Sequence, residues 1–221
     1  MKRFFRRHAT LWMLIGFCLL LGLFLSLRTG IFFTGRNLIN ILEANSFKLL
    51  LAIGMTFVIA SGGIDLSVGS ILSLSAIFTA LCMKQNIPVW LAILVGLLSG
   101  ILMGLINGAL IHFTGINAFI ITLGTSFLYR GLALIVTRGT PVSKLPAAYR
   151  AFGGGDIFQV ESGVYMALLV LLLSIPLLYK MRWGHYITTL GGNPVALRRC
   201  GVRTGAWRIS TFAVMGFLAA L

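Results

Sequence analysis

The chain has 221 residues, of which 58% are hydrophobic and 10% are charged, and its mean hydropathy is +1.00. A soluble domain carries about a quarter charged residues, so this composition excludes a water-soluble enzyme and a disordered segment. The net charge of +14 could indicate nucleic-acid binding. The basic residues lie in short segments between apolar runs, however, which the membrane interface explains better. The composition predicts a polytopic membrane protein with no nucleic-acid partner.

Apolar runs that could cross about 30 Å of hydrocarbon recur along the chain. The first, Ala9–Leu27, is uncharged and follows the basic start MKRFFRRH. The residues after it make a poor cleavage site, so we expect a retained helix and not a signal peptide. Further spans are predicted at Leu49–Ala60, at Leu66–Met83, on either side of His112–Asn117 in the uncharged tract after Pro88, and at Ser162–Tyr179. Ile209–Leu221 is uncharged but short, which predicts a truncated seventh helix that finishes beyond these residues.

The basic residues give these spans a direction, because cytoplasmic segments of membrane proteins are rich in Lys and Arg. A dense group precedes the first span, consisting of Lys2, Arg3, Arg6 and Arg7. It favours a cytoplasmic N-terminus, and alternate crossings then place the basic segment Lys180–Arg208 in the cytoplasm as well. The outer segments also carry bases, including Lys144 and Arg150. The sequence predicts an all-α, polytopic transmembrane helical bundle, with about six complete helices and a truncated seventh, as a single domain over residues 1–221.

Glycines recur at every fourth position of the fourth predicted span, GLLSGILMGLING. Gly96, Gly100, Gly104 and Gly108 therefore lie on one face of the helix. In lipid such a face lets a neighbouring helix approach closely, which favours fixed helix packing; a sliding surface during transport is the alternative. Beside this stripe, Asn107 is expected to hydrogen-bond to another helix.

Polar side chains share one side of the fifth predicted span, AFIITLGTSFLYRGLALIVT. Thr122, Thr125, Ser126 and Tyr129 recur at helical spacing, and Arg130 adjoins them. A polar face inside a membrane points to the bundle interior or to a water-filled path, so Thr122, Ser126 and Tyr129 are candidate substrate-pathway residues. The alternative is that Ser and Thr bond to their own helix while Arg130 extends its charge toward the interface.

Between the second and third predicted spans, the segment SGGIDLSVGS combines a helix break with an isolated carboxylate. Gly62 and Gly63 should end one helix, and Asp65 should cap the next. Irregular backbone at membrane depth is tolerated where protein or a cavity surrounds it. Gly62, Gly63, Asp65 and Ser67 are therefore candidates for a gate or pathway lining, and a tight helical hairpin is the alternative.

The segment GGNPVALRRCGV predicts a short helix within a cytoplasmic coupling segment at about residues 182–208. Asn193 can cap this helix, Pro194 suits its first position, and Gly201 suits its terminal turn. Such a helix in a basic loop would offer a rigid surface to a soluble partner, or it would lie on the lipid surface with Arg198 and Arg199.

Signatures of catalysis and metal binding are missing from the sequence. The chain has no GxxxxGK[ST] loop and no GxSxG or HExxH motif. Its three histidines are isolated, and its three cysteines have no metal-ligand spacing. We therefore expect no catalytic residue, no metal site and no cofactor bound by this chain.

Three tracts together resemble a known family. GMTFVIASGGIDLSVGSILSLSA, Gly54–Ala76, resembles the signature of the permease subunits of bacterial carbohydrate ABC importers, of the ribose, xylose, arabinose and galactofuranose type that includes the autoinducer-2 permeases. AFIITLGTSFLYRGLALIVTRG, Ala118–Gly139, is similar to the family's second conserved tract. GGNPVALRRCGV, Gly191–Val202, is similar to its cytoplasmic coupling segment, although the family commonly has Glu-Ala-Ala where this chain has Val-Ala-Leu after Asn-Pro. The resemblance runs in order from about Asn37 to the end.

The resemblance implies a non-catalytic transmembrane subunit of an ATP-driven importer, which translocates a monosaccharide-like substrate across the bacterial inner membrane. The implied partners are a cytoplasmic ABC ATPase that binds ATP and Mg²⁺, a periplasmic sugar-binding protein, a second permease subunit in a homo- or heterodimer, and membrane lipid. Coupling to the ATPase would involve Gly192, Asn193, Pro194, Ala196, Arg198, Arg199 and Gly201.

An ion-coupled secondary transporter of a small polar solute is the alternative function, since such transporters also use broken helices. It would need an intramembrane acid for ion coupling, and Asp65 is the only candidate. A purely structural membrane subunit is a third interpretation, in which the polar faces are incidental.

Overall fold

The computed structural model describes residues 9–143, 145–146, 149, 155–157 and 159–221. The chain divides into two compact units, one that runs up to Asn45 and one that covers Ser46–Leu221. The single domain over residues 1–221 stays a prediction. The bases used to orient the N-terminus and two of the predicted outer bases lie outside the described residues: Lys2, Arg3, Arg6, Arg7, Lys144 and Arg150.

Helices make up most of the described residues. They are α2 (Ala9–Thr29), α3 (Gly35–Ala60), α4 (Val68–Lys84), α5 (Val89–Thr114), α6 (Ala118–Thr137), α8 (Ser162–Tyr179), α9 (Arg182–Gly192), α10 (Pro194–Arg199) and α11 (Thr204–Ala220). The described strands, β1 (Asp156–Ile157) and β2 (Val160–Glu161), pair antiparallel in a short hairpin with two residues in each strand. The predicted all-helical fold is therefore confirmed.

Among the described residues, five helices are long and apolar enough to cross a membrane, namely α2, α3, α5, α6 and α8. The apolar helix α4 is shorter, with 17 residues. The predicted sixth span coincides with α8, but α3 begins at Gly35 and not at Leu49. Arg36, Glu43 and Lys48 interrupt the apolar run without ending the helix, because all three residue types have good helix propensity.

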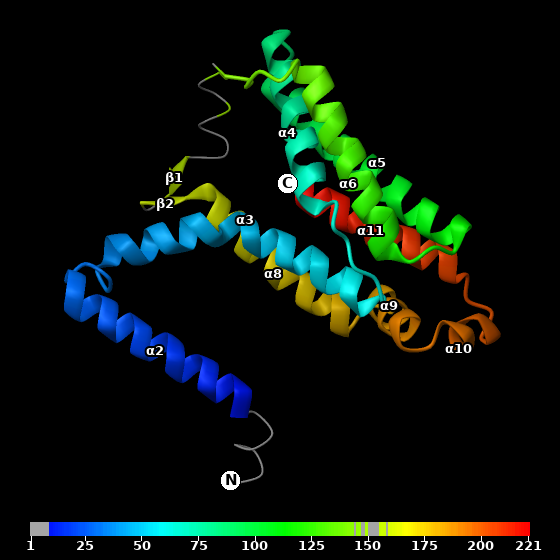
Figure 1. Cartoon of the computed structure of the whole chain (residues 1–221), viewed down its shortest axis with the longest axis horizontal. Coiled ribbons are helices and arrows are strands. Elements are labelled where there is room, and N and C mark those ends of the chain that lie inside the picture. The colour runs from blue at the N-terminus through cyan, green and yellow to red at the C-terminus, as the bar shows by residue number, and fades with distance from the viewer. Residues whose placement is uncertain (1–8, 144, 147–148, 150–154, 158) are drawn as a thin grey trace. The chain divides into compact units, whose positions relative to one another are not determined.

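Within the second unit, α4, α5, α6 and α11 pack against one another around a common core (Figure 1). Ile71 and Leu74 of α4, Met103 of α5, Tyr129 of α6 and Ala219 of α11 are buried together there. This core fixes the relative positions of the three helices that carry the polar side chains singled out in the sequence.

The glycine stripe of α5 lies against two neighbouring helices. A Cβ added to Gly104 would overlap the carbonyl oxygen of Phe212 in α11. Gly100 meets Gly216 of α11 in the same way, so the two helices touch through their backbones. All four stripe glycines lie close to a neighbouring helix. Gly96 meets the Thr79 side chain of α4, and Gly100, Gly104 and Gly108 meet the backbone of α11. Close backbone approach of this kind gives helices van der Waals contact that larger side chains would prevent.

The short helix α9 packs against α3 and α11. Ile187 of α9 is buried with Ile53 and Phe57 of α3 and with Leu218 of α11. The rings of Phe57 and Trp183 meet edge to face with centroids 5.1 Å apart. Aromatic pairs with this geometry contribute beyond their buried area, so α9 is held firmly on the end of α3.

Candidate functional site

A break in helical structure separates α3 from α4 at residues 61–67. Gly62 has a φ of +81°, a left-handed conformation that glycine adopts without steric cost. The N–H of Gly63 donates to the carbonyl oxygen of Val58 at 3.0 Å, which closes the last turn of α3. The two glycines therefore end the helix as the sequence predicts, and the chain then enters the interior of the second unit.

Asp65 is fully buried in this break. Its Oδ1 accepts hydrogen bonds from the backbone N–H of Ser67 at 2.8 Å and from the Ser67 hydroxyl at 2.6 Å. The Oδ2 atom is buried and has no hydrogen-bond partner among the described residues. A buried polar atom without a partner costs free energy, so this atom is the least satisfied point of the cluster.

The prediction that Asp65 caps the next helix is wrong in its register. The helix α4 begins at Val68, and its N-cap residue is Ser67, whose own side chain makes no capping bond. Asp65 lies two residues before Ser67 and binds the N–H of the cap itself. Its carboxylate thereby orders the entry into α4 without occupying the capping position.

A chain of hydrogen bonds joins this break to α5 and α6. The side-chain amide of Asn107 in α5 donates to the Ser67 hydroxyl at 2.7 Å. The Tyr129 hydroxyl in α6 lies 3.1 Å from Asn107 Oδ1 and 3.1 Å from the carbonyl oxygen of Met103, either of which can accept its proton. The predicted interhelical hydrogen bond of Asn107 is confirmed. Asp65, Ser67, Asn107 and Tyr129 thus form one polar network, with at most 3% of each residue exposed.

Two further contacts tie α6 to the break and to α4. The Leu66 N–H donates to Thr122 Oγ1 at 3.0 Å, and the Thr122 hydroxyl reaches the Ala118 carbonyl of its own helix at 2.8 Å. The hydroxyls of Ser70 and Ser126 lie 2.9 Å apart. The sequence leaves two interpretations of this polar face open, a bond to its own helix or a place in the bundle interior. Thr122 shows both. Arg130, next to this face, is exposed.

The structure brings the predicted gate residues together, away from the lining of the cavity described next. The second unit holds a cavity of about 800 Å³ lined by α3, α4, α5, α8, α11 and the segment after α6. Phe47, Leu72 and Met166 are among its mostly apolar lining residues. None of the predicted pathway residues lines it. The polar cluster is a set of hydrogen bonds that fixes the break against α5 and α6.

The predicted coupling segment contains the short helix α10. The Asn193 side chain accepts a hydrogen bond from the Ala196 N–H at 2.9 Å, Pro194 occupies the first turn, and Gly201 follows the helix with a φ of +77°. This punctuation is the one that the sequence predicts. Leu197 is buried, which anchors the helix.

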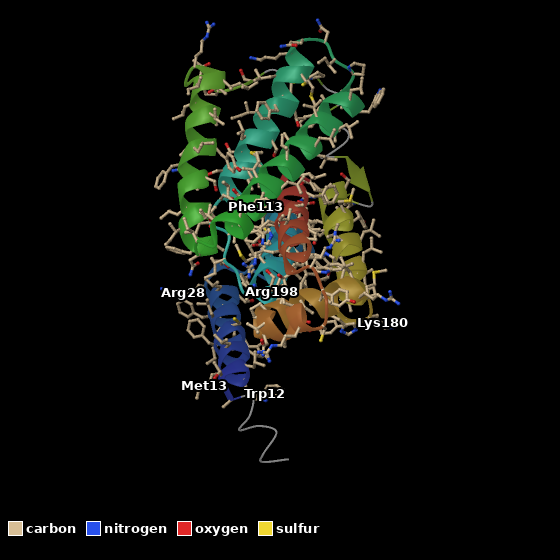
Figure 2. The ribbon with its side chains drawn as sticks, turned by 90° about the vertical axis from the view of Figure 1, so that its right-hand side faces the viewer. Trp12, Met13, Arg28, Phe113, Lys180 and Arg198 are labelled. Atoms are coloured by element: carbon tan, nitrogen blue, oxygen red, sulfur yellow. The ribbon has the colours of Figure 1, made fainter. Side chains whose placement is uncertain are left out.

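The outer face of α10 is basic. Gly192, Asn193, Ala196, Arg198, Arg199 and Gly201 are exposed, and Pro194 is partly so. Figure 2 shows Arg198 and Lys180 at the same end of the second unit, where α8, α9 and α10 meet. A capped helix with exposed arginines can bind an acidic surface.

Two features of the site were not singled out in the sequence. Ser70 faces Ser126, and the backbone of Gly191 in α9 touches the break. Ser70 belongs to a run of serines in α4 without a clear period, so its sequence gives no reason to choose it. Gly191 is one of two adjacent glycines, and a close approach that uses only one of them leaves no signal in the sequence.

Comparison with known proteins identifies relatives over most of the chain. A ribose import permease protein, RbsC, of Haemophilus influenzae is 35% identical over 194 residues, which are 86% of this chain and 60% of that protein. The D-allose transport system permease protein AlsC of Escherichia coli is 32% identical over 219 residues, 99% of this chain and 66% of that protein. The autoinducer 2 import system permease protein LsrC of Yersinia pestis is 34% identical over 190 residues, 86% of this chain and 54% of that protein. No solved structure matches.

The chain thus spans about 60% of the length of the curated ribose permeases that it matches. It is a multi-pass membrane protein by its helices and by these relatives. The family model described as the permease component of the branched-chain amino acid transport system matches residues 37–221. The chain therefore belongs to this family of non-catalytic permease components.

Proposed function

We propose that the chain is the membrane-spanning part of an ATP-driven importer for a monosaccharide-like substrate. The observation that carries this proposal is the family match over residues 37–221, together with relatives named for ribose, allose and autoinducer 2 import. These relatives share a small, polyhydroxylated substrate chemistry, and the family description supplies the role of permease. Substrate would cross the bacterial inner membrane through a path that this chain forms with a second copy or a related subunit, its N-terminus lying in the cytoplasm.

The energy for transport would come from a partner. The chain has no phosphate-binding loop, and the described residues hold no group of three His, Cys, Asp or Glu that could bind a metal ion. ATP and Mg²⁺ would be bound by a cytoplasmic ATPase that docks on α10, and a periplasmic binding protein would deliver the sugar. The exposed Arg198 and Arg199 on a rigidly capped helix support the docking site.

The gate that we propose is the break at residues 61–67 with its network. Gly62, Gly63 and Asp65 supply irregular backbone and a carboxylate. Ser67 and Thr122 bond to the break directly, Tyr129 is joined to it through Asn107 of α5, and Ser126 ties α6 to α4 through Ser70. Since these residues are mostly buried, the described arrangement corresponds to a closed gate. Opening would exchange these hydrogen bonds for contacts with water or with the hydroxyl groups of a sugar.

An ion-coupled secondary transporter is the second candidate, and one observation favours it. The Oδ2 of Asp65 finds no hydrogen-bond partner in the part of the chain that the structure describes, and it is a buried carboxylate oxygen of the kind that ion-coupled transporters use. The two candidates differ in what drives uptake, so one experiment separates them.

The test is uptake of radiolabelled ribose by cells that express the full-length permease with its partner ATPase and sugar-binding protein. We expect uptake to continue when a protonophore collapses the ion gradient while ATP is maintained, and to stop when arsenate depletes ATP. We also expect the ATPase to copurify with the permease. Uptake that survives ATP depletion and collapses with the gradient, with no ATPase retained, would refute the proposal. If ribose is not taken up, the same assay is run with allose and fructose.

A further inference from the structure

The break at residues 61–67 touches α9 directly through backbone atoms. A Cβ added to Gly191 would overlap the carbonyl oxygen of Ala60 and would lie 2.9 Å from the backbone nitrogen of Gly62. In the other direction, a Cβ added to Gly62 would lie 3.1 Å from the Cα of Gly191. The end of α9 and the break therefore meet without side chains between them. A displacement of either backbone is passed to the other because no flexible side chain is present to absorb it.

The neighbouring glycine shows that this contact is specific. Gly192 follows Gly191 directly, yet a Cβ added to Gly192 would find no atom within 4 Å. Both residues lie at the end of α9, so they share helix propensity and sequence context. The closeness is thus a property of one position and not of the glycine pair.

On its other side, Gly191 lies next to the coupling helix. A single residue, Asn193, separates α9 from α10, and its N–H donates to the Thr189 carbonyl at 2.8 Å while its side chain caps α10. Residues of α9 are fixed on α3 by the contact of Trp183 with Phe57, and on α11 by the bond from Trp183 Nε1 to the Ser210 hydroxyl at 3.1 Å. The helix α9 is therefore a short rigid piece that has α10 at one end and the break beside it.

From these contacts we infer that Gly191 is a positioning residue, through which α9 transmits a movement of the coupling helix α10 to the gate backbone at Gly62. The inference rests on the proposed function, since it assigns the route by which a docked ATPase acts on the break. The break is suited to receive the movement, because residues 63–67 lack the regular hydrogen bonds of a helix and are held by the network of Asp65, Ser67 and Asn107. Stressing this backbone would alter those bonds first.

The first test compares Gly191→Ala with Gly124→Ala in α6, where an added Cβ meets no atom within 4 Å. Both variants are made in the full-length permease and assembled with its ATPase and binding protein in proteoliposomes. For Gly191→Ala we expect the ATPase to remain bound and to hydrolyse ATP, while the number of sugars transported per ATP falls at least tenfold. For Gly124→Ala we expect that ratio to stay within twofold of the parent protein. A variant that fails to fold lowers the rate of sugar transport and the rate of ATP hydrolysis together. The ratio of these two rates in the assembled fraction then stays the same. An unchanged ratio in Gly191→Ala would overturn the inference.

The second test works even if Gly191→Ala does not assemble, because it leaves the contact unaltered. Spin labels are placed on exposed sites, at Ile64 in the break, at Gly192 beside α10, and at Ile135 in α6 as the reference. The background replaces the native cysteines by serine, among them Cys18, Cys82 and Cys200. When ATP and vanadate are added to the full complex, we expect both distances to Ile135 to change while the distance between labels 64 and 192 stays the same.

Either a change in the 64–192 distance or a label at 192 that does not move relative to Ile135 would overturn the inference. The proposed function is checked separately in the same preparation by ATP-driven uptake. If uptake depends on ATP but the labels behave otherwise, only the transmission route is wrong. If uptake does not depend on ATP, the proposed function itself is wrong.

Discussion

The side-chain amide of Asn107 donates a 2.7 Å hydrogen bond to the hydroxyl of Ser67, and this bond joins the interior of α5 to the break that precedes α4. Both residues are fully buried. The Ser67 hydroxyl in turn donates to Asp65, so the amide of one helix orders the carboxylate of another segment. A network that spans three elements in this way makes the break dependent on the packing of α4, α5 and α6.

Replacing Asn107 should destabilise the bundle. Asn107→Leu keeps the branched shape of the side chain but removes the donor to Ser67 and an acceptor for Tyr129. We expect a loss of about 1–2 kcal/mol in the free energy of unfolding, since a hydrogen bond between membrane helices contributes less than a buried hydrogen bond in a soluble protein. The measurement is unfolding of the purified protein by SDS in mixed micelles. Ser99→Ala on the same helix is the control, because Ser99 bonds only to the Gly96 carbonyl of its own helix among the described residues; a similar loss there would contradict the prediction.

Adding a single methyl group to the glycine stripe should also lower the stability of the helix bundle. Gly104→Ala places a methyl group against the Phe212 carbonyl in α11, and separating the two backbones should cost about 1–3 kcal/mol. The matched control is Gly124→Ala in α6, where a Cβ meets no atom within 4 Å. There we expect no loss, and a gain of up to about 1 kcal/mol from better helix propensity. Thermal unfolding of both variants in the same detergent measures the difference, and equal stability of the two would show that α5 and α11 can adjust.

Two substitutions of Asp65 distinguish its role as a hydrogen-bond acceptor from a role that requires its negative charge. In Asp65→Asn the remaining oxygen can still accept from the N–H and hydroxyl of Ser67, whereas Asp65→Ala leaves both donors buried without a partner. We expect the Asn variant to keep at least half of the ATP-driven uptake, and the Ala variant to lose about 1–3 kcal/mol of stability. Uptake is normalised to the amount of protein in the membrane. A folded Asn variant without uptake would show that the charge itself is required, which favours ion coupling.

Charge reversal on the coupling helix should weaken the complex with the ATPase. Arg198 and Arg199 are exposed on α10, so Arg198→Glu or Arg199→Glu changes the surface without removing a buried contact. We expect each to lower the affinity for the ATPase about tenfold, or about 1.4 kcal/mol. Lys84→Glu, an exposed reversal at the end of α4, should leave the affinity unchanged. Binding is measured with both proteins in detergent, and unchanged binding in the α10 variants would assign these arginines to lipid contact.

Local sequence signals located most of the helices and their ends. The span Ser162–Tyr179 and the punctuation of α10 by Asn193, Pro194 and Gly201 could be predicted, because apolar length and capping act over a few neighbouring residues. The start of α3 could not, since charged residues with good helix propensity end an apolar run without ending the helix. The same limit applies to α11, which begins at Thr204 ahead of the apolar run.

The sequence by itself determined the membrane class, the helical fold and the list of polar residues that could form a site, because hydropathy and periodicity are properties of each segment alone. Only the tertiary structure decided that Asp65 binds the N–H of Ser67, that Asn107 links that serine to Tyr129, and that Gly191 touches the break. Apart from Asp65 and Ser67, which are two residues apart, these partners lie on elements far apart in the chain. Their pairing follows from the packing of α4, α5 and α6 against one another and from the close approach of α9 to the end of α3, which no single segment encodes.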